Sequence, residues 1–89
     1  MTYYVYILES EKDGSLYKGY TTDCQKRLEY HNTGKSRYTS KKLPWKFVYI
    51  EECTTKSEAL KREKSLKRSN QEYLKWLITQ PTNILKNME

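Results

Sequence analysis

The chain has little histidine and cysteine, and it has no long hydrophobic run. It contains one histidine, His31, and two cysteines, Cys24 and Cys53, which form no CxxC pair. This composition argues against a structural zinc site, which needs several Cys or His ligands at short spacing. The N-terminus turns polar too soon for a signal peptide, and no apolar segment has the length of a membrane span. We therefore expect a reduced, cytoplasmic protein with free thiols.

Positive charge and tyrosine are abundant instead. The 17 Lys and Arg residues outnumber the 11 Asp and Glu residues, which gives a formal net charge of +6. A small domain with this charge favours a polyanionic partner, most often nucleic acid. Nine tyrosines, two tryptophans and one phenylalanine accompany a hydrophobic content of only 36% in 89 residues. The core must therefore rely on aromatic rings, and tyrosine can fill a core while it presents a hydroxyl.

The hydrophobic pattern predicts three strands and three helices in one small domain. Residues 3–9, "YYVYILE", are apolar on both faces and predict a strand at the centre of its sheet. We expect an α+β fold, a three-stranded antiparallel sheet flanked by helices in the order β-β-α-β-α-α, over residues 1–80. The C-terminal tail, residues 81–89, is expected to be flexible. In chain order the other predicted elements are a strand over 16–20 after an Asp13-Gly14 turn, a helix after Thr22, a basic loop over 35–44, a strand over 45–53, a helix over about 56–67 and a helix over "QEYLKWLI".

Capping boxes mark the start of each predicted helix. The three Ser/Thr and Glu/Gln pairs at this spacing are Thr22 with Gln25, Thr55 with Glu58, and Ser69 with Glu72. Gly34 marks the end of the first helix, and Pro81 marks the end of the last.

One acid stands among five bases in "ALKREKSLKR", residues 59–68. With Ala59 at zero on a helical wheel, Leu60 lies at about 100°, Leu66 at about 340° and Glu63 at about 40°. Glu63 therefore points toward the body of the protein, where a carboxylate must be paired, hydrogen-bonded or bound to a metal. A pair with Arg27, a backbone donor or partial solvation would explain it structurally. A metal ligand or a catalytic acid would explain it functionally.

Arg27 and His31 are spaced i, i+4 and share one face of the first predicted helix. This arrangement suits a pocket in which Arg27 forks onto phosphate and His31 hydrogen-bonds or transfers protons. A purely structural explanation is an Arg stem along the core rim and a histidine whose ring nitrogens are satisfied.

The tyrosines of the predicted hairpin offer a third feature. Tyr17 and Gly19 share one face of the second strand, and an even-numbered loop places Tyr6 on that same face of the sheet. A glycine inside a strand often marks the close approach of a ligand or another group. Core packing is the alternative for each tyrosine taken alone.

Together these residues resemble the GIY-YIG nuclease family. The elements are "YVY" at 4–6 and "YKG" at 17–19, followed by Arg27, His31 and Glu63. The resemblance covers residue 3 to about 78 and is greatest to small, stand-alone members. Two positions depart from the family pattern, since Tyr4 replaces the glycine of GIY and Lys18 replaces the isoleucine of YIG.

The resemblance implies hydrolysis of DNA phosphodiester bonds with one divalent ion, Mg²⁺ or Mn²⁺. By position, Glu63 would hold the metal and Arg27 would supply positive charge to the phosphate. Tyr6 would be the general base, and Tyr17 would orient water or phosphate. His31 would accept the proton of Tyr6 or hydrogen-bond the phosphate. Only Glu63 is well placed among the scattered carboxylates, which favours one metal over two.

DNA binding is expected to use the basic loop, the outer face of the Glu63 helix and Lys18, through salt-sensitive backbone contacts. The residues are Lys18, Lys35, Arg37, Tyr38, Lys41, Lys42, Lys61, Lys64 and Arg68. The leading hypothesis is a structure-preferring or weakly specific endonuclease of DNA repair or recombination. A nucleic-acid-binding module with little turnover and a small ribonucleoprotein component are the alternatives.

Overall fold

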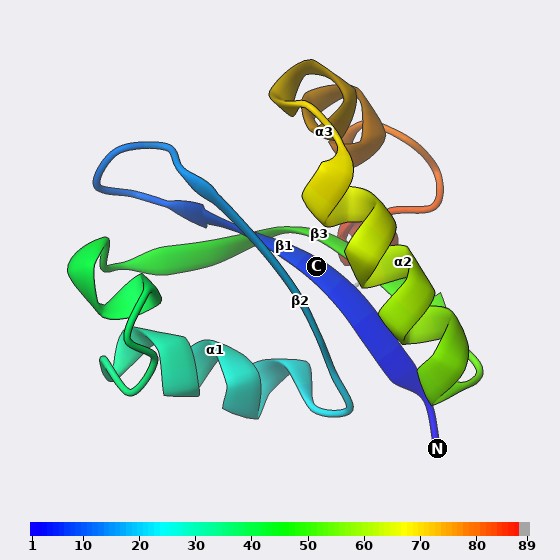
Figure 1. Cartoon of the computed structure of the whole chain (residues 1–89), viewed down its shortest axis with the longest axis horizontal. Helices are drawn as coiled ribbons and strands as arrows, with labels where there is room; N and C mark the ends of the chain where they lie inside the picture. Colours follow the sequence, from blue (N-terminus) through cyan, green and yellow to red (C-terminus); the bar gives the residue numbers. More distant parts are fainter. Residues whose placement is uncertain (88–89) are drawn as a thin grey trace.

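The computed structural model describes residues 1–87 and forms one antiparallel sheet between helices. The sheet has the order β2-β1-β3, so β1 is central and β2 and β3 are its edges. This arrangement confirms the predicted fold class and the central position of the first strand (Figure 1). The elements are β1 (Tyr3–Ser10), β2 (Leu16–Thr21), α1 (Cys24–Asn32), the 3₁₀ turn η1 (Thr39–Lys41), β3 (Trp45–Cys53), α2 (Lys56–Arg68), α3 (Gln71–Ile78) and the 3₁₀ turn η2 (Ile84–Asn87).

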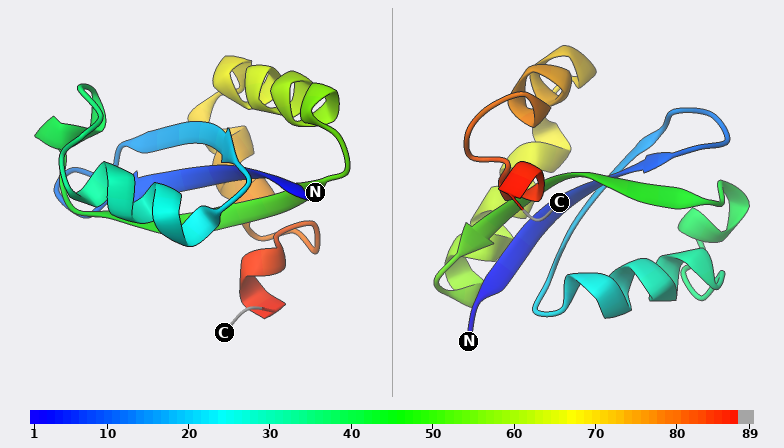
Figure 2. Two further views of the ribbon diagram at one scale, coloured as in Figure 1. Left: turned by 90° about the horizontal axis from the view of Figure 1, so that it is seen from below. Right: turned by 180° about the vertical axis from the view of Figure 1, so that it is seen from behind.

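Each face of the sheet has its own core. On one face Val5, Ile7 and Tyr49 pack with buried side chains of α2 and α3. On the other face Tyr6 and Leu8 pack with residues of α1 and the segment that follows it. Figure 2 shows α1 and α2 on opposite sides of the sheet. Successive side chains of β1 point to opposite faces of the sheet. Because both faces are covered, the apolar residues of β1 are needed on both.

The helix starts differ from the predicted boxes at two of three places. Asp23, not Thr22, caps α1, and its carboxylate accepts from the Lys26 amide at 3.1 Å. Asn70, not Ser69, caps α3 by accepting from the Tyr73 amide at 2.8 Å. In both cases two adjacent residues can serve as caps, and the one whose oxygen reaches the third amide of the helix takes the position.

The Thr55 cap of α2 is confirmed, since its side chain accepts from the Glu58 amide. The first helix ends as predicted near Gly34, which has a positive φ of 79°. The last helix ends at Ile78, before Pro81, so the proline is not its immediate terminator.

The segment after α3 covers the outer edge of β3. Asn83 is only 3% exposed, and its amide group bonds the Ile50 nitrogen at 3.2 Å and the Val48 carbonyl at 2.9 Å. Ile84 and Leu85 pack against the core on the α1 face. A loose tail from residue 81 was predicted, but the packed region continues through this segment because Asn83 satisfies the strand edge. Residues 88–89 of that predicted tail lie outside the described residues.

The edge of β2 contrasts with that of β3. In the described part of the chain β2 pairs only with β1. Its outer edge lies between α1 on one face and α2 on the other (Figure 1). None of the helices within residues 1–87 is long and apolar enough to cross a membrane.

Candidate active site

Tyr6 lies across the edge strand at Gly19. The two residues are register partners, and Tyr17 is the partner of Leu8, so Tyr6 and Tyr17 share a face as predicted. A Cβ atom added at Gly19 would lie 2.5 Å from the Tyr6 hydroxyl and 2.7 Å from its ring Cζ. Glycine is therefore required here by the close approach of the phenol. The Tyr6 side chain reaches the edge of the sheet over a position that has no side chain.

His31 is buried and holds the Tyr6 hydroxyl. Its Nε2 lies 3.0 Å from that hydroxyl, and its Nδ1 lies 2.9 Å from Oγ1 of Thr39. Burial, and secondarily the positive charge of Arg27, lowers the pKa of His31 to about 4. The imidazole is thus neutral at pH 7. At 2% exposure it has no surface for a phosphate, so of its two predicted roles the contact with Tyr6 is the one the geometry supports.

The buried His31 makes stability depend on pH. Its folded pKa of about 4 is below the ordinary value of about 6.5, so the unfolded chain binds more protons between these pH values. The contribution of His31 to the free energy of unfolding is complete above pH about 6.5. It is lost as pH falls toward 4, by about 2–3 kcal/mol. In urea unfolding at pH 7.5 and 4.5, His31→Gln should lose less stability than wild type on acidification. Equal losses in the two proteins would contradict the assignment.

Arg27 and Glu63 carry opposite charges that both act on the Tyr6 hydroxyl. Burial, and next the neighbouring Tyr17, raises the pKa of Tyr6 well above its usual value. Arg27 opposes this rise and Glu63 adds to it, so both charges lie within electrostatic range of Tyr6. Because α1 and α2 cover opposite faces, the two side chains approach the edge of β2 from opposite sides.

Glu63 faces inward, as the helical wheel predicted. Its side chain is 18% exposed, and its carboxylate pairs with Lys67 at 3.5 Å. The structural explanations considered from sequence were a pair with Arg27, a backbone donor or partial solvation; the carboxylate is partly solvated, and its partner is a lysine one helical turn away. Arg27 instead lies over the ring of Tyr30, with 5.1 Å between the guanidinium carbon and the ring centroid.

The buried stripe of α2 differs from the predicted arc. Ala59 and Leu66 are fully buried, but Leu60 is 42% exposed. Arg62, placed off the arc by the wheel, is partly buried and bonds the Glu51 carboxylate through Nε at 3.1 Å. The stripe is narrower than predicted because Arg62 and Glu63 flank it on opposite sides. Each of these two charged side chains therefore reaches a different edge of the sheet.

The metal-binding side chains present suit a site in which the protein supplies one ligand to the metal. No cluster of three or more His, Cys, Asp or Glu side chains that could hold a metal occurs in the described residues. Glu63 is a partly buried carboxylate whose charge acts on the Tyr6 hydroxyl. Mg²⁺ takes oxygen ligands and commonly uses one or two carboxylates, substrate phosphate and several waters. The residues present thus fit a one-carboxylate metal site and not a two-metal site.

The residues predicted to bind DNA divide into several groups. Tyr38 is 54% exposed and stacks on Tyr17, with 5.9 Å between ring centroids. Lys42 is engaged by Asp13 at 3.4 Å and by the Ser15 hydroxyl at 2.9 Å. Lys61 lies in a hollow with Glu51, Glu52 and Glu58. The remaining exposed members are Lys35, Arg37, Lys41, Lys64 and Arg68.

Two lysines near the site were missed by the sequence interpretation. Lys67 pairs with Glu63 and lines a hollow with Leu16, Tyr17, Lys18 and Tyr38. Lys56 lines another hollow that includes Arg27. The helical wheel contained the signal, because Lys56 and Lys67 lie at about 60° and 80°, beside Glu63 at about 40°. Lys61, Lys64 and Arg68 lie at about 140–200°, on the side of the wheel opposite Ala59.

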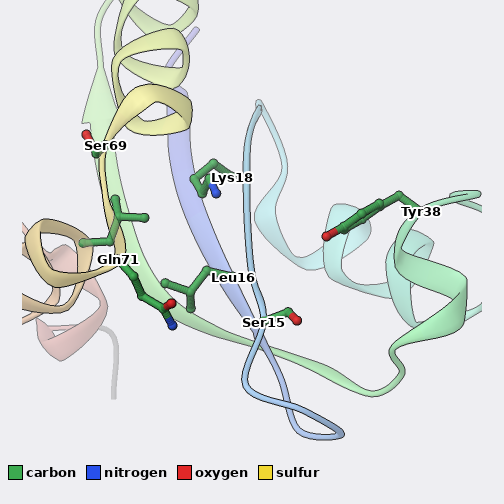
Figure 3. Close-up of a pocket in the computed structure, with 7 residues that line it drawn as sticks. Ser15, Leu16, Lys18, Tyr38, Ser69 and Gln71 are labelled. Atoms are coloured by element: carbon green, nitrogen blue, oxygen red, sulfur yellow. The ribbon is translucent and has the colours of Figure 1, made fainter.

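Lys18 and Tyr38 border the edge strand from its two sides. Figure 3 shows Lys18 and Leu16 on the side of the α2–α3 turn and Tyr38 on the other side of β2. Both residues line the hollow that contains Ser69 and Gln71. The candidate site therefore combines groups from both faces of the sheet at one open strand edge.

Comparison with known proteins identifies the class. The family model described as the GIY-YIG catalytic domain matches residues 2–75. The chain belongs to the GIY-YIG family, and a nuclease-type activity on nucleic acid follows from that membership.

Relatives of similar size are known. A UPF0213 protein of Streptococcus agalactiae is 43% identical over 81 residues, which cover 90% of this chain and 91% of the relative. A UPF0213 protein of Staphylococcus saprophyticus is 49% identical over 75 residues, or 82% and 90% of the two chains. The solution structure of a UPF0213 protein from Bacillus halodurans matches with a TM-score of 0.61 and 35% identity, over 99% of this chain and 94% of that one.

Proposed function

We propose that this chain is a divalent-metal-dependent endonuclease that hydrolyses phosphodiester bonds in DNA. The observation that carries the proposal is the position of the Tyr6 hydroxyl, which lies over Gly19 at the edge of β2 and hydrogen-bonds His31, with the charges of Arg27 and Glu63 within electrostatic range. Phosphodiester hydrolysis needs a base for water, positive charge on the phosphate and a stabilised leaving group. Tyr6, Arg27 and Glu63 supply a proton acceptor, a fixed cation and a metal ligand.

Tyr6 is the proposed general base, with His31 as the group behind it. The raised pKa of Tyr6 keeps its hydroxyl protonated at neutral pH, so to act as a base it needs the Arg27 charge and a bound metal ion to lower this pKa, and a neighbour to accept its hydrogen bond. His31 Nε2 is within hydrogen-bond distance and is neutral. With Nδ1–H donating to Thr39, Nε2 accepts from Tyr6, whose oxygen is then free to accept from an attacking water.

Arg27 is proposed to bind the scissile phosphate and Glu63 to hold the metal. A guanidinium fixed at the phosphate stabilises the charge that develops in the transition state. Mg²⁺ or Mn²⁺ bound there would polarise the phosphate and acidify a bound water. Tyr17 lies with its ring 5.0 Å from that of His31 and is proposed to orient water or phosphate.

The DNA backbone is proposed to follow the edge of β2. Lys18, Lys67 and Tyr38 border one part of this edge and Lys56 with Arg27 another. Their contacts are to phosphate, so affinity should fall with salt and depend little on sequence. We propose a structure-preferring or weakly specific enzyme of DNA repair or recombination. Free Cys24 and Cys53 support the cytoplasmic location.

The function is tested by incubating purified wild type with plasmid, forked and single-stranded DNA. Each substrate is offered with Mg²⁺, with Mn²⁺ and with chelator. We expect strand cleavage with either ion and none with chelator, and faster cleavage of one DNA structure. Binding of all three substrates without cleavage in any buffer would overturn the proposal in favour of a nucleic-acid-binding module.

Gly19→Ala should damage the site without unfolding the domain. The new methyl group would clash with the Tyr6 hydroxyl and ring, which must then move from the edge of β2. Since displacements of about 1 Å can cost about 100-fold in rate, we expect cleavage to fall by about 10- to 100-fold. Cleavage rates, thermal unfolding and DNA affinity are measured together. A normal cleavage rate would show that the position of Tyr6 is not important.

A further inference from the structure

Lys67 lies between the Glu63 carboxylate and a hollow at the edge of β2. On one side its ammonium is 3.5 Å from a carboxylate oxygen of Glu63, and the lysine side chain is 53% exposed. A pair at i, i+4 whose lysine is half exposed is weak, and the carboxylate can exchange it for a stronger partner. A divalent ion is a stronger partner for a carboxylate than a flexible ammonium is.

On its other side Lys67 lines a hollow that lacks negative charge. The lining residues are Leu16, Tyr17, Lys18, Tyr38 and Lys67, and the adjoining hollow adds Ser15, Ser69, Gln71 and Leu74. No Asp or Glu is among the residues that line these two hollows. Burial, and next the charge of Lys67, lowers the pKa of Lys18, so the two ammonium groups act on each other.

Two ammonium groups at one hollow are a favourable site for a phosphate. Figure 3 shows Lys18 and Tyr38 bordering this region from the two sides of β2. Tyr17 is part of the same lining, so a phosphate there would lie next to the proposed catalytic groups. An anion in this position relieves the repulsion between Lys18 and Lys67.

We propose that Lys67 is an exchange cation that couples metal binding to DNA binding. Before metal binds, Glu63 holds Lys67. When a divalent ion takes the Glu63 carboxylate, Lys67 is released to join Lys18 on a backbone phosphate of the substrate. The inference rests on the proposed function for the role of Glu63. Linkage then requires that metal strengthen DNA binding and that DNA strengthen metal binding by the same factor.

The test measures this coupling in proteins that carry Tyr6→Phe, so that the DNA stays intact. Affinity for a short labelled DNA strand is measured by fluorescence anisotropy with and without Mn²⁺, at constant ionic strength. Affinity for Mn²⁺ alone is measured by calorimetry. In the parent we expect Mn²⁺ to strengthen DNA binding by about 3- to 10-fold. In Lys67→Gln this enhancement should shrink to the part that comes from contact between the metal and phosphate, while Mn²⁺ alone binds about twofold more tightly because its competitor is gone.

Lys46→Gln is the matched control. Lys46 lies on β3, and its side chain is also 53% exposed. It pairs with Glu9 of β1 at 3.6 Å. The Lys46→Gln substitution removes the same charge as Lys67→Gln, and this variant should keep the Mn²⁺ enhancement of DNA binding. An enhancement of unchanged size in Lys67→Gln, or one reduced equally in Lys46→Gln, would overturn the exchange.

Glu63→Gln separates this inference from the proposed function. Unchanged Mn²⁺ affinity in Glu63→Gln would overturn both, because Glu63 would not be the metal ligand. Mn²⁺ binding that needs Glu63, combined with an intact enhancement in Lys67→Gln, would overturn the exchange alone and leave the proposed nuclease function standing.

Discussion

Glu63→Gln should lower the rate of DNA cleavage by about 1,000-fold, while DNA affinity in chelator is kept or rises because Lys67 loses its carboxylate partner. The glutamine keeps the shape of the side chain and removes the inward negative charge of Glu63 that acts on the Tyr6 hydroxyl. Loss of the Lys67 pair costs only about 0.3–0.5 kcal/mol, so the fold should persist. The rate is measured under single-turnover conditions with Mg²⁺.

Glu9→Gln provides the control for this change. Glu9 is also partly buried, with a side chain 35% exposed and paired to a lysine, and it is not among the residues that line the two hollows beside β2. Its variant should cleave at the wild-type rate. Cleavage by Glu63→Gln at that same rate would remove the carboxylate from the chemistry.

Tyr6→Phe should lower cleavage by about 100- to 1,000-fold with little effect on DNA affinity. The substitution keeps the ring that packs against Phe47, at 5.6 Å between centroids, and removes the hydroxyl that bonds His31. The loss leaves His31 Nε2 with an unmade hydrogen bond, which should cost about 1–2 kcal/mol of stability. Cleavage is therefore compared at a temperature where both proteins are folded.

Tyr49→Phe separates the chemical effect from the structural one. Tyr49 is fully buried on the opposite face and bonds Glu51 through its hydroxyl, and burial together with that bond raises its pKa to about 12. We expect its variant to be destabilised and still active. If Tyr6→Phe and Tyr49→Phe lost activity in proportion to stability alone, Tyr6 would have no role as a base.

The fold was largely predictable because short-range signals agree with one another. The apolar residues of β1 on both faces indicated its central position, and the Asp13-Gly14 turn fixed an antiparallel hairpin. The shared face of Tyr6 and Tyr17 was predicted on the condition of an even-numbered loop, and the observed register meets that condition. The docking of Asn83 on β3 was not predictable, since a single polar side chain in a short segment carries no periodic signal.

The candidate site was predictable in part. The inward position of Glu63 follows from helical spacing alone. The burial of His31 does not, because it depends on Thr39, a residue outside the helix that satisfies its second nitrogen. The role of Lys67 was hidden because a lysine four residues after a glutamate resembles an ordinary surface pair.

The central claim is that one divalent ion binds through Glu63 at the edge of β2. Mn²⁺ is paramagnetic and broadens the NMR signals of nuclei near it, so a titration with small amounts of Mn²⁺ maps the site directly. The account predicts that the amide signals of Gly19, Glu63 and Lys67 broaden first and that Glu63→Gln abolishes the effect. Earliest broadening at Glu51, Glu52 and Glu58, which line the acidic hollow beside Arg62, would contradict it.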